Sequence, residues 1–214
     1  MVRSLSGYCT KPGRTSLESE GSLQYANYRG EAEDLRVVVE HFHTERRLIL
    51  AIIGHSKGGS VVVNYASRYN DNVQIFVNIS GCFNLNRLTE DILGKDFHEK
   101  LQQYGFIDVE TRRGKTEYRV TKESLMDLLR EDIRAACQAI PPNCRVLTVQ
   151  GTVDEIIPVE DAIQFSKYIP NHNLCIVEGA DHEYTKHQSE LASIVLNFVK
   201  TGLHKDDSMP KSRL

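Results

Sequence analysis

The sequence predicts an α/β fold with a mostly parallel sheet, flanking helices and an inserted lid. Short apolar segments alternate with amphipathic helical segments on both sides of residues 82–142, and this alternation is typical of βαβ units. The apolar segments have few polar positions, as expected for parallel strands buried on both faces. With 214 residues and 40% hydrophobic content, the chain is long enough to form one such domain.

The first half of the chain supplies one βαβ unit. Residues 1–25 are polar and lack an apolar period, so we expect a loop or a poorly ordered segment there. From about Tyr28, apolar residues recur at helical spacing, and acidic residues stand near the helix start. Apolar strands are then expected over 48–53 and 73–79, with a helix over 56–69 between them.

The alternation resumes in the last third of the chain. We expect strands over 144–149 and 174–177, because both segments are short and apolar. Helices are expected over 159–168 and 187–200, where apolar residues again have helical spacing. The remaining residues, 201–214, are polar and predict a flexible tail.

Between the two halves, residues 82–142 break the alternation. Two apolar segments flank an Arg-Gly-Lys turn at 113–115 and predict a hairpin. One helical stripe follows, capped by Thr121 and stopped by two prolines. We interpret this segment as a lid inserted into a single domain over 26–200. Its candidates for lining a pocket are the aromatic residues Phe83, Phe97, Tyr104 and Phe106.

Composition excludes several classes of partner. A net charge of -3 gives no positive field that would attract nucleic acid. The longest apolar runs are far shorter than the ~20 residues of a membrane-spanning helix. The first ten residues lack the apolar stretch of a secretory signal, which predicts a cytoplasmic protein. Five cysteines without CxxC spacing indicate neither a disulfide framework nor a metal site, and no cofactor is expected.

Residues 54–58, Gly-His-Ser-Lys-Gly, match the pattern G-x-S-x-G between an apolar strand and a helix. That context is typical of a nucleophile elbow, in which glycines allow a tight turn and leave the Ser56 hydroxyl exposed. The helix start also directs backbone N–H groups at the site, and that of Lys57 is the predicted oxyanion donor. A phosphate loop is less suitable, because G-x-x-x-x-G-K-[ST] is absent.

A nucleophilic serine requires a histidine base and a carboxylate that orients the histidine. His182 lies in a loop after a strand and before the last helix, where a base reaches the carboxyl edge of the sheet. Asp154 follows another apolar strand and completes the chain order Ser, Asp, His. Glu155 and Asp181 remain alternatives for the acid. The other histidines, including His55, are interpreted as surface or structural groups.

Four segments together resemble the α/β-hydrolase superfamily, and within it plant esterase/lipase-like proteins related to monoacylglycerol lipases, serine-aminopeptidase-like hydrolases and cinnamoyl esterases. They are Glu18-Ser19-Glu20-Gly21-Ser22, Gly54-His55-Ser56-Lys57-Gly58-Gly59, Gly151-Thr152-Val153-Asp154 and Gly179-Ala180-Asp181-His182. The similarity extends over about residues 18–200 and implies a Ser-His-Asp triad under a lid. The expected reaction is hydrolysis of a small-molecule carboxylic ester through an acyl-enzyme.

The family pattern also begins with further strands and a His-Gly loop that donates a second oxyanion hydrogen bond, neither of which is found before Glu18. We therefore expect weakened catalysis. The strand over 48–53 is expected to be an exposed sheet edge, through which copies of the chain would self-associate. The alternative is a binding or regulatory protein of the hydrolase fold with little turnover.

Overall fold

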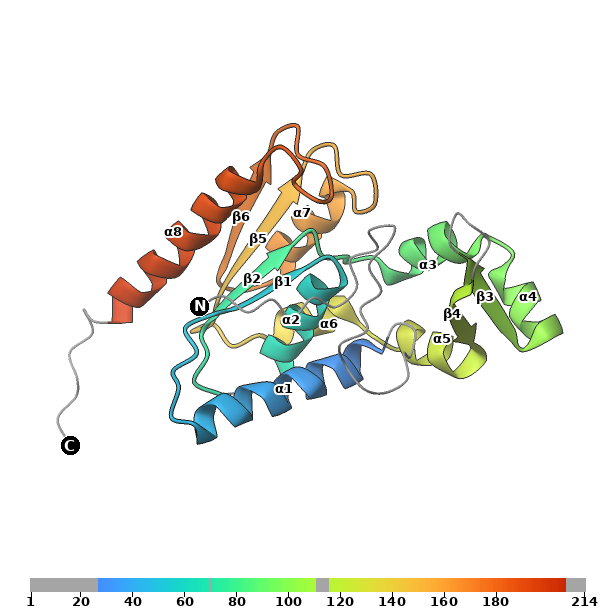
Figure 1. The fold of residues 1–214 in the computed structure, drawn as a ribbon, viewed down its shortest axis with the longest axis horizontal. Coiled ribbons are helices and arrows are strands. Elements are labelled where there is room, and N and C mark those ends of the chain that lie inside the picture. The colour runs from blue at the N-terminus through green and yellow to red at the C-terminus, as the bar shows by residue number, and fades with distance from the viewer. Residues whose placement is uncertain (1–26, 70, 111–115, 207–214) are drawn as a thin grey trace.

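A computed structural model of the chain describes residues 27–69, 71–110 and 116–206, so the prediction made for residues 1–25 lies outside them. Figure 1 shows a sheet with helices on both faces and an insert that projects to one side. The sheet is parallel throughout and has the strand order β1-β2-β5-β6, which confirms the predicted α/β class. Its strands are β1 (Ile52–His55), β2 (Ile75–Ile79), β5 (Arg145–Gly151) and β6 (His172–Val177).

The inner strand β2 is buried at all five positions. Ile75, Val77 and Ile79 belong to the hydrophobic core on one face of the sheet, whereas Phe76 belongs to the core on the other face. Successive side chains of a strand point to opposite faces, so a strand covered on both sides is apolar at nearly every position.

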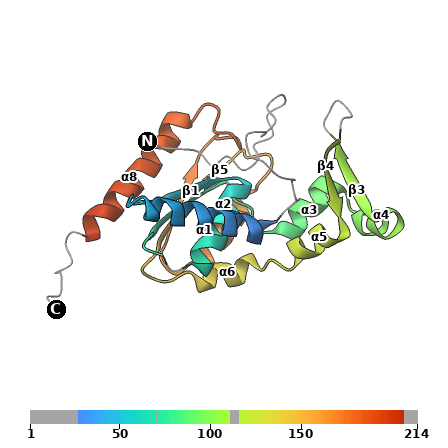
Figure 2. The same ribbon diagram turned by 60° about the horizontal axis from the view of Figure 1, so that its bottom comes forward.

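Helices cover the two faces unequally. One face carries α1 (Tyr28–Thr44), α2 (Lys57–Arg68), α6 (Ile133–Ala139) and α7 (Val159–Tyr168), and the other carries α8 (Gln188–Asp206). Figure 2 shows α1 lying along α2. The start of α1 is set by the Asn27 side chain, which accepts a hydrogen bond from the Gly30 N–H at 2.9 Å. Within the described ranges, none of these helices combines the length and apolarity that a bilayer crossing requires.

The insert between β2 and β5 contains the predicted hairpin. Its elements are α3 (Leu85–Leu93), α4 (Phe97–Tyr104), β3 (Phe106–Glu110), β4 (Thr116–Thr121) and α5 (Lys122–Leu129). The two strands pair antiparallel, with Phe106 opposite Thr121. Thr121 caps α5 as predicted, and it exchanges hydrogen bonds with Ser124 in a capping box.

The helical stripe after Thr121 forms two helices where the sequence predicted one. α5 ends at Leu129, and Asp132 starts α6 by accepting a hydrogen bond from the Ala135 N–H at 2.9 Å. The break allows α6 to pack against α2 and α7. The predicted lid range of 82–142 therefore includes a helix that belongs to the body of the domain.

Two predicted boundaries are wrong. The strand expected over 48–53 begins at Ile52, where pairing with Phe76 of β2 starts, and Leu48 is 77% exposed. The tail expected from residue 201 continues α8 as far as Asp206. Within this extension, a Cβ on Gly202 would lie 2.6 Å from the Ile75 side chain, so glycine permits α8 to lie close to the sheet there. Residues 207–214 lie outside the described ranges.

Self-association through the β1 edge stays a prediction. Among the described residues, β1 pairs with β2 alone, and Ile53 on that edge is 43% exposed. We expect a dimer whose population rises with protein concentration and falls in Ile53→Lys, because edge pairing between two chains would bury the charged lysine. Ile163→Lys, which changes an isoleucine of similar exposure (48%) on α7, is the matched control. Sedimentation velocity that finds monomer at all concentrations would contradict this expectation.

His172, the first residue of β6, predicts an acid-sensitive stability. Its Nε2 lies 2.8 Å from the Thr148 hydroxyl, and burial lowers the pKa of His172 to about 4. An unfolded histidine has a pKa of about 6.5. At a pH between about 4 and 6.5, His172 is therefore protonated in the unfolded state and neutral in the folded state. The free energy of unfolding is therefore expected to fall as the pH drops from about 6.5 to 4, by at most about 3 kcal/mol.

The variant His172→Gln isolates this effect, because a glutamine amide can keep the contact with Thr148 but does not titrate. Urea unfolding measured at a series of pH values should show a smaller loss of stability in the variant than in the unchanged chain. Equal losses would show that His172 does not control the acid sensitivity.

Candidate active site

Ser56 occupies the sharp turn between β1 and α2. Its backbone has φ 55° and ψ -124°, an unusual conformation for a residue with a side chain. The turn is held by hydrogen bonds from the Ser56 N–H to the Ile79 carbonyl at 2.8 Å and from the Gly59 N–H to the Ser56 carbonyl at 2.9 Å. These contacts place the serine at the carboxyl edge of the sheet and at the start of a helix, as in a nucleophile elbow.

The glycines around Ser56 differ in how strictly they are required. A Cβ on Gly54 would lie 2.1 Å from the Gly58 carbonyl oxygen, a backbone atom that cannot move aside cheaply. A Cβ on Gly59 would lie 2.2 Å from Oδ1 of Asn78. A Cβ on Gly58 would meet nothing within 4 Å. The close approach of strand and helix therefore excludes a side chain at Gly54, whereas a side chain at Gly59 would require the Asn78 side chain to move.

This difference predicts a large loss of stability for one alanine substitution and a small change for another. Gly54→Ala is expected to lower the free energy of unfolding by about 3 kcal/mol or more, because overpacking here displaces backbone. Gly58→Ala is expected to change it by no more than about 1 kcal/mol, because Gly58 is helical and its surroundings are open. Chemical unfolding of both variants measures the difference, and equal stabilities would refute the tight turn.

His182 connects Ser56 to Asp154. Its Nε2 lies 3.0 Å from Oγ of Ser56, and its Nδ1 lies 2.9 and 3.0 Å from the two carboxylate oxygens of Asp154. An ionised carboxylate can only accept hydrogen bonds, so the proton is on Nδ1, and Nε2 is left to accept from the serine hydroxyl. The side chains of His182 and Asp154 are 4% and 0% exposed.

Asp154 is held as a charged group. Oδ1 accepts hydrogen bonds from the N–H groups of Ile156 and Ile157 at 2.9 and 2.8 Å, and Oδ2 accepts one from Nε2 of Gln150 at 2.8 Å. Burial alone would raise the pKa of Asp154, but the hydrogen bonds from His182 and the two backbone groups outweigh it and keep the pKa below its ordinary value. The carboxylate is therefore ionised at neutral pH.

Sequence reasoning missed the contribution of Gln150. It lies near the end of β5, four residues before Asp154, and it is fully buried. Besides Asp154, its amide donates to the Ile157 carbonyl at 2.8 Å, so it fixes the loop that presents the carboxylate. The sequence signal for Gln150 was weak, because β5 also contains Arg145 and Thr148 and the strand predicted over 144–149 stopped one residue before Gln150.

The alternative acids do not contact the imidazole. Glu155 accepts a hydrogen bond from the backbone N–H of His182 at 3.3 Å, and Asp181 accepts one from the Thr185 N–H at 2.7 Å. His55, next to Ser56 in the sequence, lies with Nε2 2.8 Å from the His182 carbonyl oxygen. Of the three carboxylates considered, only Asp154 reaches the His182 ring.

Lys57 is the first residue of α2, so its backbone lies at the elbow. Its side chain extends to α1, where the ammonium pairs with Glu31 and lies 5.5 Å from the centroid of the Tyr28 ring. Burial raises the pKa of Glu31, and the Lys57 charge opposes that shift. The side chain thus fastens the elbow helix to α1, and the role of the Lys57 N–H as oxyanion donor stays a prediction.

Two cavities lie under and within the insert. One of about 740 Å³ is bounded by the starts of α3 and α7 and by the α5–α6 connection, and Phe83 lines it. The second, of about 330 Å³, is lined by Phe97. Tyr104 and Phe106, also predicted to line a pocket, line neither cavity. Ser56, Asp154 and His182 do not belong to either lining.

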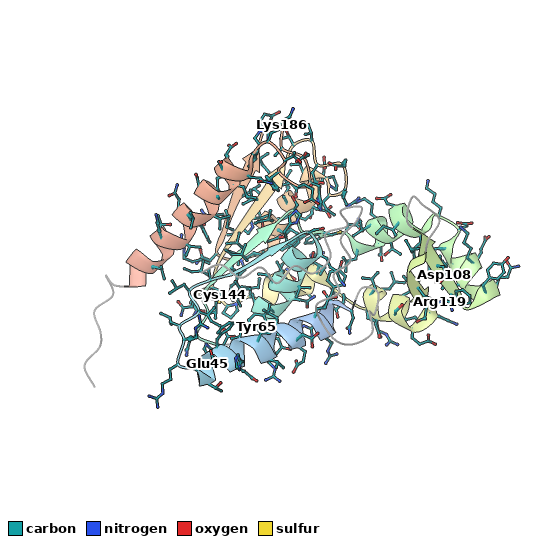
Figure 3. The ribbon with its side chains drawn as sticks, in the orientation of Figure 1. Glu45, Tyr65, Asp108, Arg119, Cys144 and Lys186 are labelled. Carbon is teal, nitrogen blue, oxygen red and sulfur yellow. The ribbon has the colours of Figure 1, made fainter. Side chains whose placement is uncertain are left out.

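Phe106 instead belongs to the outer surface of the insert. The Arg119 guanidinium lies 3.7 Å from the centroid of its ring, and Arg119 also pairs with Asp108 at 2.7 Å. Figure 3 shows Asp108 and Arg119 together on the projecting part of the insert. The aromatic ring is therefore used for local packing.

Comparison with known proteins finds no matching family model. The (R)-3-hydroxydecanoyl-ACP:CoA transacylase of Ectopseudomonas oleovorans is 23% identical over a 193-residue alignment that covers 79% of this chain. The alignment covers 65% of the transacylase, so the chain spans slightly less than two thirds of that relative.

Solved structures resemble the chain more completely. Est1E from Butyrivibrio proteoclasticus superposes with a TM-score of 0.70 at 19% identity, covering 83% of this chain and 71% of its own. The alpha/beta hydrolase GrgF from a Penicillium species has a TM-score of 0.62 at 18% identity, and the match covers 82% of this chain and 72% of GrgF. The monoacylglycerol lipase of Paleococcus ferrophilus has a TM-score of 0.55 at 16% identity, and the match covers 81% of this chain and 75% of the lipase.

Proposed function

We propose that this chain, which has the α/β-hydrolase fold, is a serine hydrolase that cleaves a carboxylic ester. The observation that carries the proposal is the continuous hydrogen-bonded chain from Asp154 through His182 to Ser56 at the elbow. A binding or regulatory protein would have no need of a buried, ionised acid aligned on a histidine and a strained serine.

The geometry supports a two-step reaction. Ser56 Oγ attacks the ester carbonyl carbon while His182 Nε2 takes the hydroxyl proton, and the Lys57 N–H stabilises the resulting oxyanion. The C–O bond to the alcohol then breaks as His182 returns the proton to the leaving oxygen, which leaves an acyl-serine. Water repeats the sequence with the same base, releasing the carboxylic acid and restoring Ser56. Asp154 remains ionised throughout and orients the imidazole.

A fluorophosphonate probe and a short nitrophenyl ester test the proposal together. We expect one probe molecule per chain, located on Ser56 by peptide mass analysis, and ester turnover that disappears when the probe has reacted. Labelling of another residue, or turnover that survives complete labelling, would refute Ser56 as nucleophile. Labelling without turnover of any ester class would favour the binding protein instead.

Acyl transfer is a second candidate reaction, because the curated relative is a transacylase. The acyl-serine is the same in both reactions, and only the acceptor differs: water in hydrolysis, a thiol or alcohol in transfer. Product analysis with increasing amounts of a small thiol separates the two. A product ratio that follows the thiol concentration with saturation would indicate an acceptor site, whereas acid release unaffected by the thiol would indicate hydrolysis.

A further inference from the structure

The backbone of His182 is held as closely as its ring. Its N–H donates to Oε2 of Glu155 at 3.3 Å, and its carbonyl oxygen lies 2.8 Å from Nε2 of His55. Its two ring nitrogens contact Asp154 and Ser56. Every polar group of this residue therefore has a partner, although the residue lies in a connection between β6 and α8 rather than in a helix or strand.

The four partners form two pairs of chain neighbours. Ser56 and Asp154 contact the ring, and His55 and Glu155, the residue before one and the residue after the other, contact the backbone. The elbow and the acid loop each supply one ring contact and one backbone contact. A movement of either loop relative to His182 would stretch a backbone contact together with a ring contact.

His55 is suited to this role by its protonation. A carbonyl oxygen only accepts, so Nε2 of His55 carries the proton. The His55 ring is half-buried, with its centroid 4.9 Å from that of His182. Burial lowers the pKa of His55, so the ring is neutral near pH 7 and has a single N–H, which it directs at the His182 carbonyl. A neutral neighbour also avoids repelling the imidazolium that forms during the reaction.

We propose that His55 and Glu155 are positioning residues, which hold the His182 backbone so that its imidazole keeps both ring contacts while it gains and loses a proton. This inference rests on the proposed hydrolase function. His55 is expected to matter more, because its contact is shorter and half-buried, whereas Glu155 is exposed and its contact is longer. Misplacement of a catalytic group by about 1 Å can cost about 10²-fold in rate.

Two substitutions of His55 separate the effect of losing its hydrogen-bond donor from the effect of changing its side-chain shape. In His55→Leu, which has no donor, kcat is expected to fall about tenfold or more while KM changes by less than about twofold, because a misplaced base slows the reaction rather than weakening substrate binding. In His55→Gln, whose amide nitrogen can reach the place of Nε2, kcat is expected to recover to within about threefold of the unchanged chain. A His55→Leu variant with unchanged kcat, or a glutamine variant as slow as the leucine variant, would overturn the proposal.

His172→Leu is the matched control. It removes another half-buried histidine with an equally short side-chain contact, 2.8 Å to Thr148, but at the opposite end of the sheet from the site. It is expected to lower stability and leave the kcat of the folded protein unchanged. Glu155→Ala adds a variant on the surface that cannot fail for lack of core packing. It should lower kcat about threefold, and Glu155→Gln, which still accepts a hydrogen bond, should restore it.

A spectroscopic readout separates failure of this inference from failure of the proposed function. The Nδ1 proton of His182, hydrogen-bonded to Asp154, is expected to give a proton resonance downfield of the backbone amides that is absent from Asp154→Asn. It should persist in His55→Gln and broaden or vanish in His55→Leu. An unchanged resonance in His55→Leu would overturn the positioning role even if no ester is turned over, whereas absent labelling and turnover in the unchanged chain would reject only the hydrolase.

Discussion

Replacing Ser56 by alanine is expected to lower kcat for a nitrophenyl ester by about 10⁵–10⁶-fold, the loss found when a triad nucleophile is removed. The reason is that His182 then has no hydroxyl to deprotonate, and no acyl-enzyme can form. The loss of stability should be small, because the turn at Ser56 is held by backbone hydrogen bonds and not by its side chain. Steady-state kinetics and thermal unfolding of the same preparations measure both quantities.

Ser60→Ala is the control for this substitution. Ser60 lies one turn further along α2, fully buried, and its hydroxyl joins the N–H and the carbonyl of Cys82 at 3.0 and 2.9 Å. Its removal is expected to lower the free energy of unfolding by about 1–3 kcal/mol, because buried backbone groups lose their partner, while turnover by the folded protein persists. Comparable kinetic losses in Ser56→Ala and Ser60→Ala would show that the loss in Ser56→Ala is not specific to a nucleophile.

Replacing Asp154 by asparagine is expected to lower kcat by about 10⁴-fold. The asparagine keeps the shape of the side chain, but it is neutral, and its amide favours the wrong histidine tautomer. Only the charged carboxylate, whose pKa lies below its usual value, can both accept from Nδ1 and stabilise the imidazolium. The pH profile of kcat measured beside the unchanged chain tests whether the loss persists at every pH where the protein is folded.

Asp181→Asn supplies the comparison, because Asp181 is the carboxylate next to His182 in the sequence. It accepts a hydrogen bond from the Thr185 N–H, which an asparagine oxygen can also accept. We expect turnover within about twofold of the unchanged chain. A severe loss in Asp181→Asn together with a mild one in Asp154→Asn would reverse the assignment of the acid.

The elements that follow local rules were predicted well. The helix expected over 159–168 is α7, with Pro158 before it and two acidic residues in its first turn. The hairpin and the Thr121 cap also follow from short-range signals. The start of β1 did not follow from apolarity, because residues 48–53 are all apolar, and only pairing with β2 places the strand start at Ile52. The break between α5 and α6 likewise reflects packing of α6 on α2 and α7.

The sequence by itself determined the α/β class, the serine at a glycine-flanked turn, and the presence of an acid and a histidine after later strands. These are properties of contiguous residues: a period, a turn that only glycine permits, and the position of a polar residue directly after an apolar strand. Only the tertiary structure decided which carboxylate contacts the histidine and what the neighbours do. The contacts of His182 with Asp154, Ser56 and His55 join residues 28, 126 and 127 positions apart, and such distances are set by how the sheet brings its strand ends together.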